Sequence, residues 1–156
     1  MTKLKLILIK NPFDIKKPLT ILSYIIRKVT KSDFNHCAIM KEIDGVDCVS
    51  DFQSHSKFRP FDVWEKEDKD RIYIILDVES ILSEKEIEYN MKYSSALYDG
   101  YEHIKLLNQL FKIKLGFTVF SENSNRFVCS EWCWYLISGE DNNFKTPQDL
   151  FEFYKK

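Results

Sequence analysis

The sequence predicts an α+β fold in which an antiparallel sheet packs against helices. Three observations lead to this prediction. Residues 3–9 alternate charged and aliphatic side chains before becoming fully aliphatic, residues 36–53 have the pattern of a hairpin, and most of the later chain has helical spacing. The predicted order is strand, helix, hairpin, strand and then several helices. A chain of 156 residues fits one domain, so we expect a single domain over residues 1–156.

The predicted sheet contains four strands. Residues 3–9 form the first, and the apolar runs 36–41 and 46–53 form a hairpin around Asp44-Gly45, a dipeptide that favours a two-residue turn. Residues 71–78 are almost continuously apolar. We therefore expect them to form a central strand.

The predicted helices share apolar residues three or four positions apart, and two of them begin with capping signals. Ser83 with Glu86 forms a capping box, and Thr146 precedes a proline at the first helical position. The charged stretch 62–70 is predicted to be a solvated turn, with contact to a partner as the alternative. The expected helices cover residues 18–29, 83–97, 101–113 and 129–138, the last ending at Gly139, followed by a short helix after Thr146.

Composition excludes several classes of function. With 23 basic and 24 acidic residues, the net charge of −1 provides no excess of cations for a nucleic-acid backbone. No apolar stretch is long enough to span a membrane, and lysines interrupt the apolar N-terminal run, so we expect neither a membrane span nor a signal peptide. Four cysteines without a secretion signal predict reduced thiols in the cytoplasm, or in a host cytoplasm if the protein is viral.

The hairpin places a histidine beside an acid. If Asp44-Gly45 forms a two-residue turn, paired residue numbers sum to 89, so His36 lies opposite Gln53 and Ala38 lies opposite Asp51. His36, Asp51 and Gln53 then share one face of the sheet. Either Asp51 or Gln53 could hold the imidazole in one tautomer, Asp51 with a full charge and Gln53 with an amide dipole.

Cys129 lies where a polar loop gives way to an amphipathic helix. Free backbone N–H groups and the helix dipole at that position favour a thiolate and can also stabilise an oxyanion. A buried cysteine that only fills the core is the alternative interpretation. Cys133, one helical turn later, is predicted to pack in the core, and no second pair of ligands completes a zinc site, so no metal is expected.

The remaining two cysteines are assigned structural positions. Cys37 follows His36 directly and should therefore point to the opposite face of the strand, where we expect it to be buried. Cys48 lies across from Lys41 in the same hairpin register.

Three segments together resemble the circularly permuted NlpC/P60 (papain-like) superfamily, in the branch that includes YiiX-like and YycO-like proteins. They are Asn35-His36-Cys37-Ala38-Ile39, Tyr98-Asp99 and Phe127-Val128-Cys129-Ser130-Glu131, the last being the most specific. In this branch the histidine strand precedes the cysteine helix. The chain departs from the family in carrying Asp51 or Gln53 where a glutamate is frequent, and Ala38 where a glycine is frequent.

The resemblance implies a permuted papain-like fold, with Cys129 as nucleophile, His36 as base and Asp51 as the best third member. It implies a thiol hydrolase or acyltransferase acting on a peptide, another amide or an acyl lipid, without a cofactor. Two alternatives remain open: a catalytically silent binding module on the same fold, acting on a host or partner protein, and a lipid acyltransferase or lipase with an apolar groove that includes Phe117 and Phe120. The sequence leaves the oligomeric state undetermined.

Overall fold

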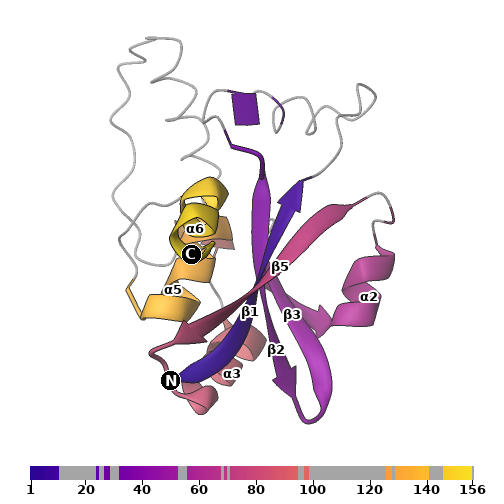
Figure 1. The fold of residues 1–156 in the computed structure, drawn as a ribbon. Coiled ribbons are helices and arrows are strands. Elements are labelled where there is room, and N and C mark those ends of the chain that lie inside the picture. The colour runs from indigo at the N-terminus through magenta and orange to yellow at the C-terminus, as the bar shows by residue number, and fades with distance from the viewer. Residues whose placement is uncertain are drawn as a thin grey trace.

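The fold is built on a five-stranded antiparallel sheet that carries helices on both faces (Figure 1). The strand order is β4-β3-β2-β1-β5. The strands are β1 Thr2–Lys10, β2 His36–Ile43, β3 Val46–Phe52, β4 Ser56–Pro60 and β5 Ile72–Ser80. The computed structural model describes residues 1–10, 24, 27–28, 32–52, 56–67, 69, 71–94, 97–98, 126–127, 129–140 and 146–155.

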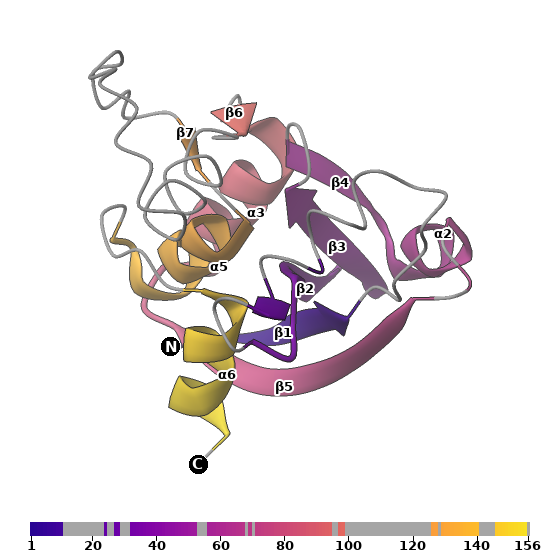
Figure 2. The same ribbon diagram turned by 90° about the horizontal axis from the view of Figure 1, so that it is seen from above.

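Two apolar clusters lie on opposite faces of the sheet. The face that carries the larger cluster is covered by α3 (Glu84–Tyr93), α5 (Cys129–Ser138) and α6 (Pro147–Tyr154). The face that carries the smaller cluster is covered by α2 (Phe61–Lys66). Figure 2 shows α2 separated from these three helices by the sheet. Alternation along β1 creates the division, because Leu4, Leu6 and Leu8 belong to the first cluster whereas Ile7 and Ile9 belong to the second.

The α+β class and the antiparallel sheet are confirmed. The hairpin register is also confirmed, because Ala38 pairs with Asp51 and Lys41 with Cys48. The turn residues explain this register. Asp44 and Gly45 have φ values of 53° and 79°, the left-handed pair that a type I′ turn requires.

The predicted helix starts are confirmed where the structure describes them. The predicted capping box forms at Ser83, and Thr146 caps α6 as predicted and also forms a box with Asp149. Each hydroxyl accepts from the backbone N–H three residues later. Helix α5 begins at Cys129, and Gly139, with a φ of 70°, follows its last residue. Helix α3 ends at Tyr93, four residues before the predicted end, and Tyr98 lies in a short strand instead.

That short strand brings a distant segment to the start of α5. Strand β6 (Leu97–Tyr98) pairs in parallel with β7 (Arg126–Phe127), and Tyr98 lies opposite Phe127. Backbone pairing between residues about thirty positions apart cannot be read from helical periodicity, which is why the predicted helix was too long.

The prediction that residues 71–78 form a central strand is wrong. Within the described residues β5 pairs only with β1 and forms an edge of the sheet, and Ile72, Ile74 and Ile75 are exposed. Strand β2 is the central strand, and β1 lies between it and β5. An apolar run signals a strand, but its position in the sheet depends on which strands pair with it.

The prediction of a solvated turn over residues 62–70 is wrong for residues 62–66, which belong to helix α2, whereas Glu67 and Lys69 do lie in an exposed turn. The charged side chains of the helix face solvent, whereas Phe61 and Trp64, three positions apart, stack on each other at 5.7 Å between ring centroids. Trp64 is fully buried against the sheet. The high density of charge in this stretch concealed a narrow apolar face.

Some predictions fall outside the described residues. These are most of the predicted helix 18–29, the helix 101–113, and the candidate residues Gln53, Phe117 and Phe120. Of residues 18–29, Tyr24, Arg27 and Lys28 are described and all three are helical. Among the helices that are described, none has the length and apolar character needed to cross a membrane.

Candidate active site

His36 is the first residue of β2, and its position is set by the loop that precedes it. The backbone N–H of Asn35 donates to the carbonyl of Ile9 at 3.0 Å, which attaches the loop to β1. Helix α6 holds the loop from the other side, because the N–H of Asp33 donates to Oε1 of Gln148 at 3.0 Å. The rings of Phe34 and Phe151 also pack at 5.1 Å.

The imidazole of His36 contacts a fully buried carboxylate. Nε2 of His36 lies 2.5 Å from Oδ1 of Asp51, whose side chain has no exposed surface. The hairpin register explains the contact, because Asp51 pairs with Ala38, two residues beyond His36 on the same face of β2. The bond leaves Nδ1 as the ring nitrogen available to a further partner. The side chain of His36 is 14% exposed.

Cys129 opens α5, and two polar contacts fix that helix on the sheet. Nε1 of Trp132 donates to Oγ of Ser50 at 3.0 Å, and Oγ of Ser80 donates to the carbonyl of Leu136 at 2.7 Å. All four residues are buried. These contacts fix the position of the start of α5 relative to β2. Cys129 itself is 5% exposed.

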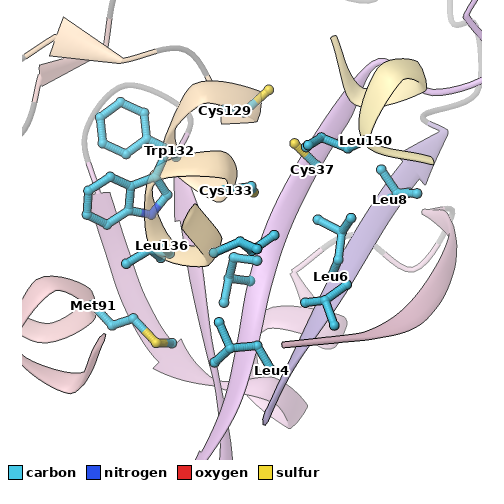
Figure 3. Packing of buried hydrophobic residues seen from close by; sticks show 14 of the residues in the cluster. Leu4, Leu6, Leu8, Cys37, Met91, Cys129, Trp132, Cys133, Leu136 and Leu150 are labelled. Atoms are coloured by element: carbon cyan, nitrogen blue, oxygen red, sulfur yellow. The ribbon is translucent and has the colours of Figure 1, made fainter. Parts of the chain in front are cut away.

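The Cys129 thiol has two partners on β2, His36 and Cys37, and interacts with each by charge and by a side-chain hydrogen bond. Figure 3 shows Cys129 on the first turn of α5 and Cys37 across from it on the strand, with Cys133 one turn further along the helix. The hydrogen bond with Cys37 and burial raise the pKa of the Cys129 thiol well above its usual value, and His36 acts in the opposite direction.

The charge of His36 depends on both neighbours. Burial by itself would lower the pKa of the imidazole, but interactions with Cys129 and Asp51 outweigh it and raise that pKa to about 10. Asp51 is affected reciprocally. Burial opposes its ionisation, yet His36, Trp64 and Arg59 together lower the pKa of this carboxyl to about 2. At neutral pH the site thus contains an ionised acid beside a readily protonated imidazole.

The structure therefore brings together three of the four residues chosen from the sequence: Cys129, His36 and Asp51. The fourth, Gln53, lies outside the described residues. Cys37 is buried on the face of the sheet opposite Ala38, as predicted. Cys129 lies on that same face, so Cys37 is a neighbour of the proposed site and not only a core residue. Cys133 belongs to the apolar cluster, which agrees with its predicted packing role.

Sequence reasoning missed two residues of the site, Trp64 and Arg59. Both donate to Oδ2 of Asp51, at 2.9 Å and 3.2 Å respectively. The only available signal was a tryptophan within a strongly charged stretch, three residues after Phe61. That spacing suits one face of a helix but gives no indication of what the indole contacts.

The arrangement is suited to nucleophilic chemistry. A thiol at a helix start, an imidazole next to it and a carboxylate behind the imidazole are the components of a thiol-imidazole-carboxylate site. Among the described residues, no group of three or more histidine, cysteine or acidic side chains is arranged to hold a metal ion. The chain matches no protein-family model and no curated protein sequence.

Proposed function

We propose that the chain is a cysteine-dependent hydrolase or acyltransferase that cleaves an amide or ester bond, with Cys129 as nucleophile. His36 is the general base and acid, and Asp51 orients it. The observation that carries the proposal is that Cys129, at the start of α5, interacts with His36 of the hairpin. His36 in turn lies 2.5 Å from Asp51, measured from Nε2 to Oδ1. Side chains that are about ninety positions apart in sequence converge on one point.

The proposed reaction is acyl transfer through a thioester. His36 takes the proton of the Cys129 thiol or holds the thiolate as an ion pair, and the thiolate attacks the carbonyl carbon of the substrate. The backbone N–H of Cys129, at the start of α5, and a neighbouring donor hold the oxyanion. Imidazolium then protonates the leaving group, and water or another acceptor attacks the thioester to release the acyl group. The residues present supply every step without a cofactor.

The proposed architecture is the permuted papain-like one. The histidine strand precedes the cysteine helix along the chain, and α5 packs on β2 beside the hairpin that supplies the acid. The substrate class extends over peptides, other amides and acyl lipids. A cytoplasmic site of action belongs to the same proposal, because all four cysteines are free thiols.

One observation favours a second candidate, a binding module without catalytic activity. Cys129 is 5% exposed, and its contact with Cys37 raises the pKa of its thiol, as does burial. A buried, protonated thiol is a poor nucleophile. On this candidate, the same fold would recognise a partner protein while Cys129 served only the core.

Thiol labelling distinguishes the two candidates without knowledge of the substrate. We expect iodoacetamide to modify Cys129 before the other three cysteines, as mapped by mass spectrometry of the digested protein. Cys129→Ala should remove both the fast labelling and any hydrolysis of peptide or thioester substrates, while the circular dichroism spectrum is retained. Cys133→Ala, one turn away on the same helix, is the matched control and should keep both activities.

The binding module predicts the opposite result. Cys129 would then react no faster than Cys48, and Cys129→Ala would leave every measured activity unchanged. Accumulation of a stable acyl-enzyme with short-chain phospholipids, but not with peptides, would assign the lipid branch of the proposal.

A further inference from the structure

The carboxylate of Asp51 is held from the face of the sheet opposite Cys129. Oδ1 meets His36, whereas Oδ2 accepts from Nε1 of Trp64 at 2.9 Å and from Arg59 at 3.2 Å. Trp64 belongs to α2, and its side chain lies in the second apolar cluster together with Ala38 and Met40. Asp51 therefore links a helix on one face to the imidazole that interacts with Cys129 on the other.

The indole of Trp64 is fixed in place by its own neighbours. Phe61 stacks on it at 5.7 Å between ring centroids, and Tyr73 of β5 meets it edge-on at 5.6 Å. The guanidinium of Arg71 lies 4.1 Å from the ring centroid and donates to the carbonyl of Trp64 at 3.2 Å. With no exposed surface and contacts on several sides, the indole N–H has one available direction, toward Asp51.

Arg59 provides the second donor and a charge. Its guanidinium bridges Oδ2 of Asp51 and Oε2 of Glu67, at 3.2 Å and 3.0 Å, and its side chain is only 10% exposed. Arg59 is part of β4, directly before α2, so both donors come from one continuous stretch of chain. That stretch ends at Glu67, which neutralises the remaining charge of Arg59.

We propose that Trp64 is a positioning residue for the reaction: its N–H, assisted by Arg59, holds the Asp51 carboxylate so that Oδ1 faces His36. The inference rests on the proposed function, and it assigns to α2 a role that nothing in the charged stretch 62–70 indicates. Trp64 touches none of the reacting groups and acts only through Asp51. A carboxylate with both oxygens bound cannot rotate away from the imidazole, and it stabilises the imidazolium that the chemistry needs.

Removal of the indole N–H should weaken this arrangement with little change in shape. In Trp64→Phe, Oδ2 keeps only the more distant Arg59 of these two donors, so the buried carboxylate is less stable and less well oriented. The imidazolium of His36 is then less stabilised, and its favourable effect on ionisation of Cys129 falls. Alkylation of Cys129 by iodoacetamide should become about tenfold slower at pH 7, and its pH midpoint should move to higher pH.

A double-mutant cycle tests whether Trp64 acts through Asp51. Asp51→Asn should slow alkylation at least as much as Trp64→Phe, and Trp64→Phe should add little in the Asp51→Asn background. The proposal is overturned if the pH midpoint of Cys129 alkylation is unchanged in Trp64→Phe. It is also overturned if Trp64→Phe shifts that midpoint equally in the wild-type and Asp51→Asn backgrounds. If Trp64→Phe fails to fold, 3-benzothienylalanine at position 64 removes the N–H with almost no change of shape and is read in the same way.

Tyr73→Phe is the matched control, because it removes a polar hydrogen from the same aromatic cluster while keeping the ring that packs against Trp64. The Tyr73 hydroxyl donates to Glu65 and not to Asp51. The pH dependence of Cys129 alkylation should therefore remain that of the wild type. A shift in Tyr73→Phe equal to that in Trp64→Phe would overturn the assignment of a specific role to Trp64.

A second readout separates this inference from the proposed function. The proton between His36 and Asp51 gives a deshielded NMR resonance that does not depend on the reactivity of Cys129. If Cys129 proves unreactive, the proposed function fails, and the resonance still decides the role of Trp64. It should move upfield or broaden in Trp64→Phe and stay in place in Tyr73→Phe. An unmoved resonance in Trp64→Phe overturns the positioning role.

Discussion

Cys129 lies between two neighbours with opposite effects on its ionisation. Cys37 and burial favour the thiol, whereas His36 favours the thiolate. His36 and Cys37 are consecutive residues whose side chains leave β2 on different faces, yet both reach Cys129. His36 can do so because it is the first residue of the strand, where its ring lies at the end of the sheet.

Cys37 therefore limits the reactivity of the proposed nucleophile. In Cys37→Ala the hydrogen bond and the charge interaction with Cys129 are lost, so the pKa of the Cys129 thiol should fall. We expect faster alkylation of Cys129 at pH 7 and a lower pH midpoint, measured by mass mapping after timed exposure to iodoacetamide. Cys133→Ala controls for the loss of a buried sulfur from the same cluster. An equal increase in both variants would show that general loosening of the core, rather than Cys37, is responsible.

Asp51 makes the stability of the fold depend on acid. Although burial disfavours its charge, the charge and hydrogen bond of His36, with Trp64 and Arg59, lower the pKa of Asp51 from 3.8 to about 2. Because the folded state holds the carboxylate more tightly than the unfolded state, the stabilisation is complete above pH 3.8 and is lost as the pH falls through about 2.

The predicted consequence is a difference between the wild type and Asp51→Asn. Between about pH 5 and about pH 2, the free energy of unfolding of the wild type should fall by on the order of 2 kcal/mol more than that of the variant. Urea titrations at several pH values measure this difference. Parallel curves for the two proteins would contradict the ionised, hydrogen-bonded Asp51 described here.

At the scale of elements, α6 acts on the site from a distance. Its residues Gln148 and Phe151 hold the loop that precedes His36, and its Leu150 lies in the larger apolar cluster (Figure 3). The helix has only eight residues, and its start depends on the capping box of Thr146 and Asp149. A short helix relies on its cap and on tertiary packing for most of its stability.

Thr146→Ala should therefore destabilise the protein by about 1 kcal/mol, because the N–H of Asp149 loses its acceptor. Thr146→Ser retains the hydroxyl and should stay close to the wild type in a urea titration. We also expect faster amide hydrogen exchange at Asp33, whose N–H is bound by Gln148 of the same helix. Equal stability of the alanine and serine variants would indicate that packing alone holds α6.

At the scale of the whole molecule, the two edges of the sheet differ. Strand β4 has α2 directly after it, whereas β5 presents the apolar side chains of Ile72, Ile74 and Ile75. Within the described residues β5 has a partner on one side only. An exposed apolar edge strand is a site at which chains associate.

Ile75→Lys should reduce association of the protein at high concentration. The residue is 41% exposed, so the change should alter the free energy of unfolding by less than about 1 kcal/mol. Static light scattering during refolding measures the effect, with Ile75→Val as the control that keeps the edge apolar. If Ile75→Lys scatters as much light as Ile75→Val, the edge of β5 does not drive association.

The sequence by itself determined the local features, because each depends on residues close together along the chain. The register of the hairpin follows from Asp44 and Gly45, the starts of α3 and α6 follow from their capping boxes, and the start of α5 at Cys129 follows from the change of periodicity. Through that register the contact between His36 and Asp51 could also be predicted. Turn and cap geometry act over two to four residues, so they can be read directly.

Only the tertiary structure decided which of these local features meet. The edge position of β5, the contact between Cys37 and Cys129, and the anchoring of Asp51 by Trp64 each join residues from separate elements. Hydrophobic burial, which drives this packing, is not directional, so a sequence pattern marks a face as buried without naming its partner. The partners follow from the complete packing of helices on both faces of the sheet.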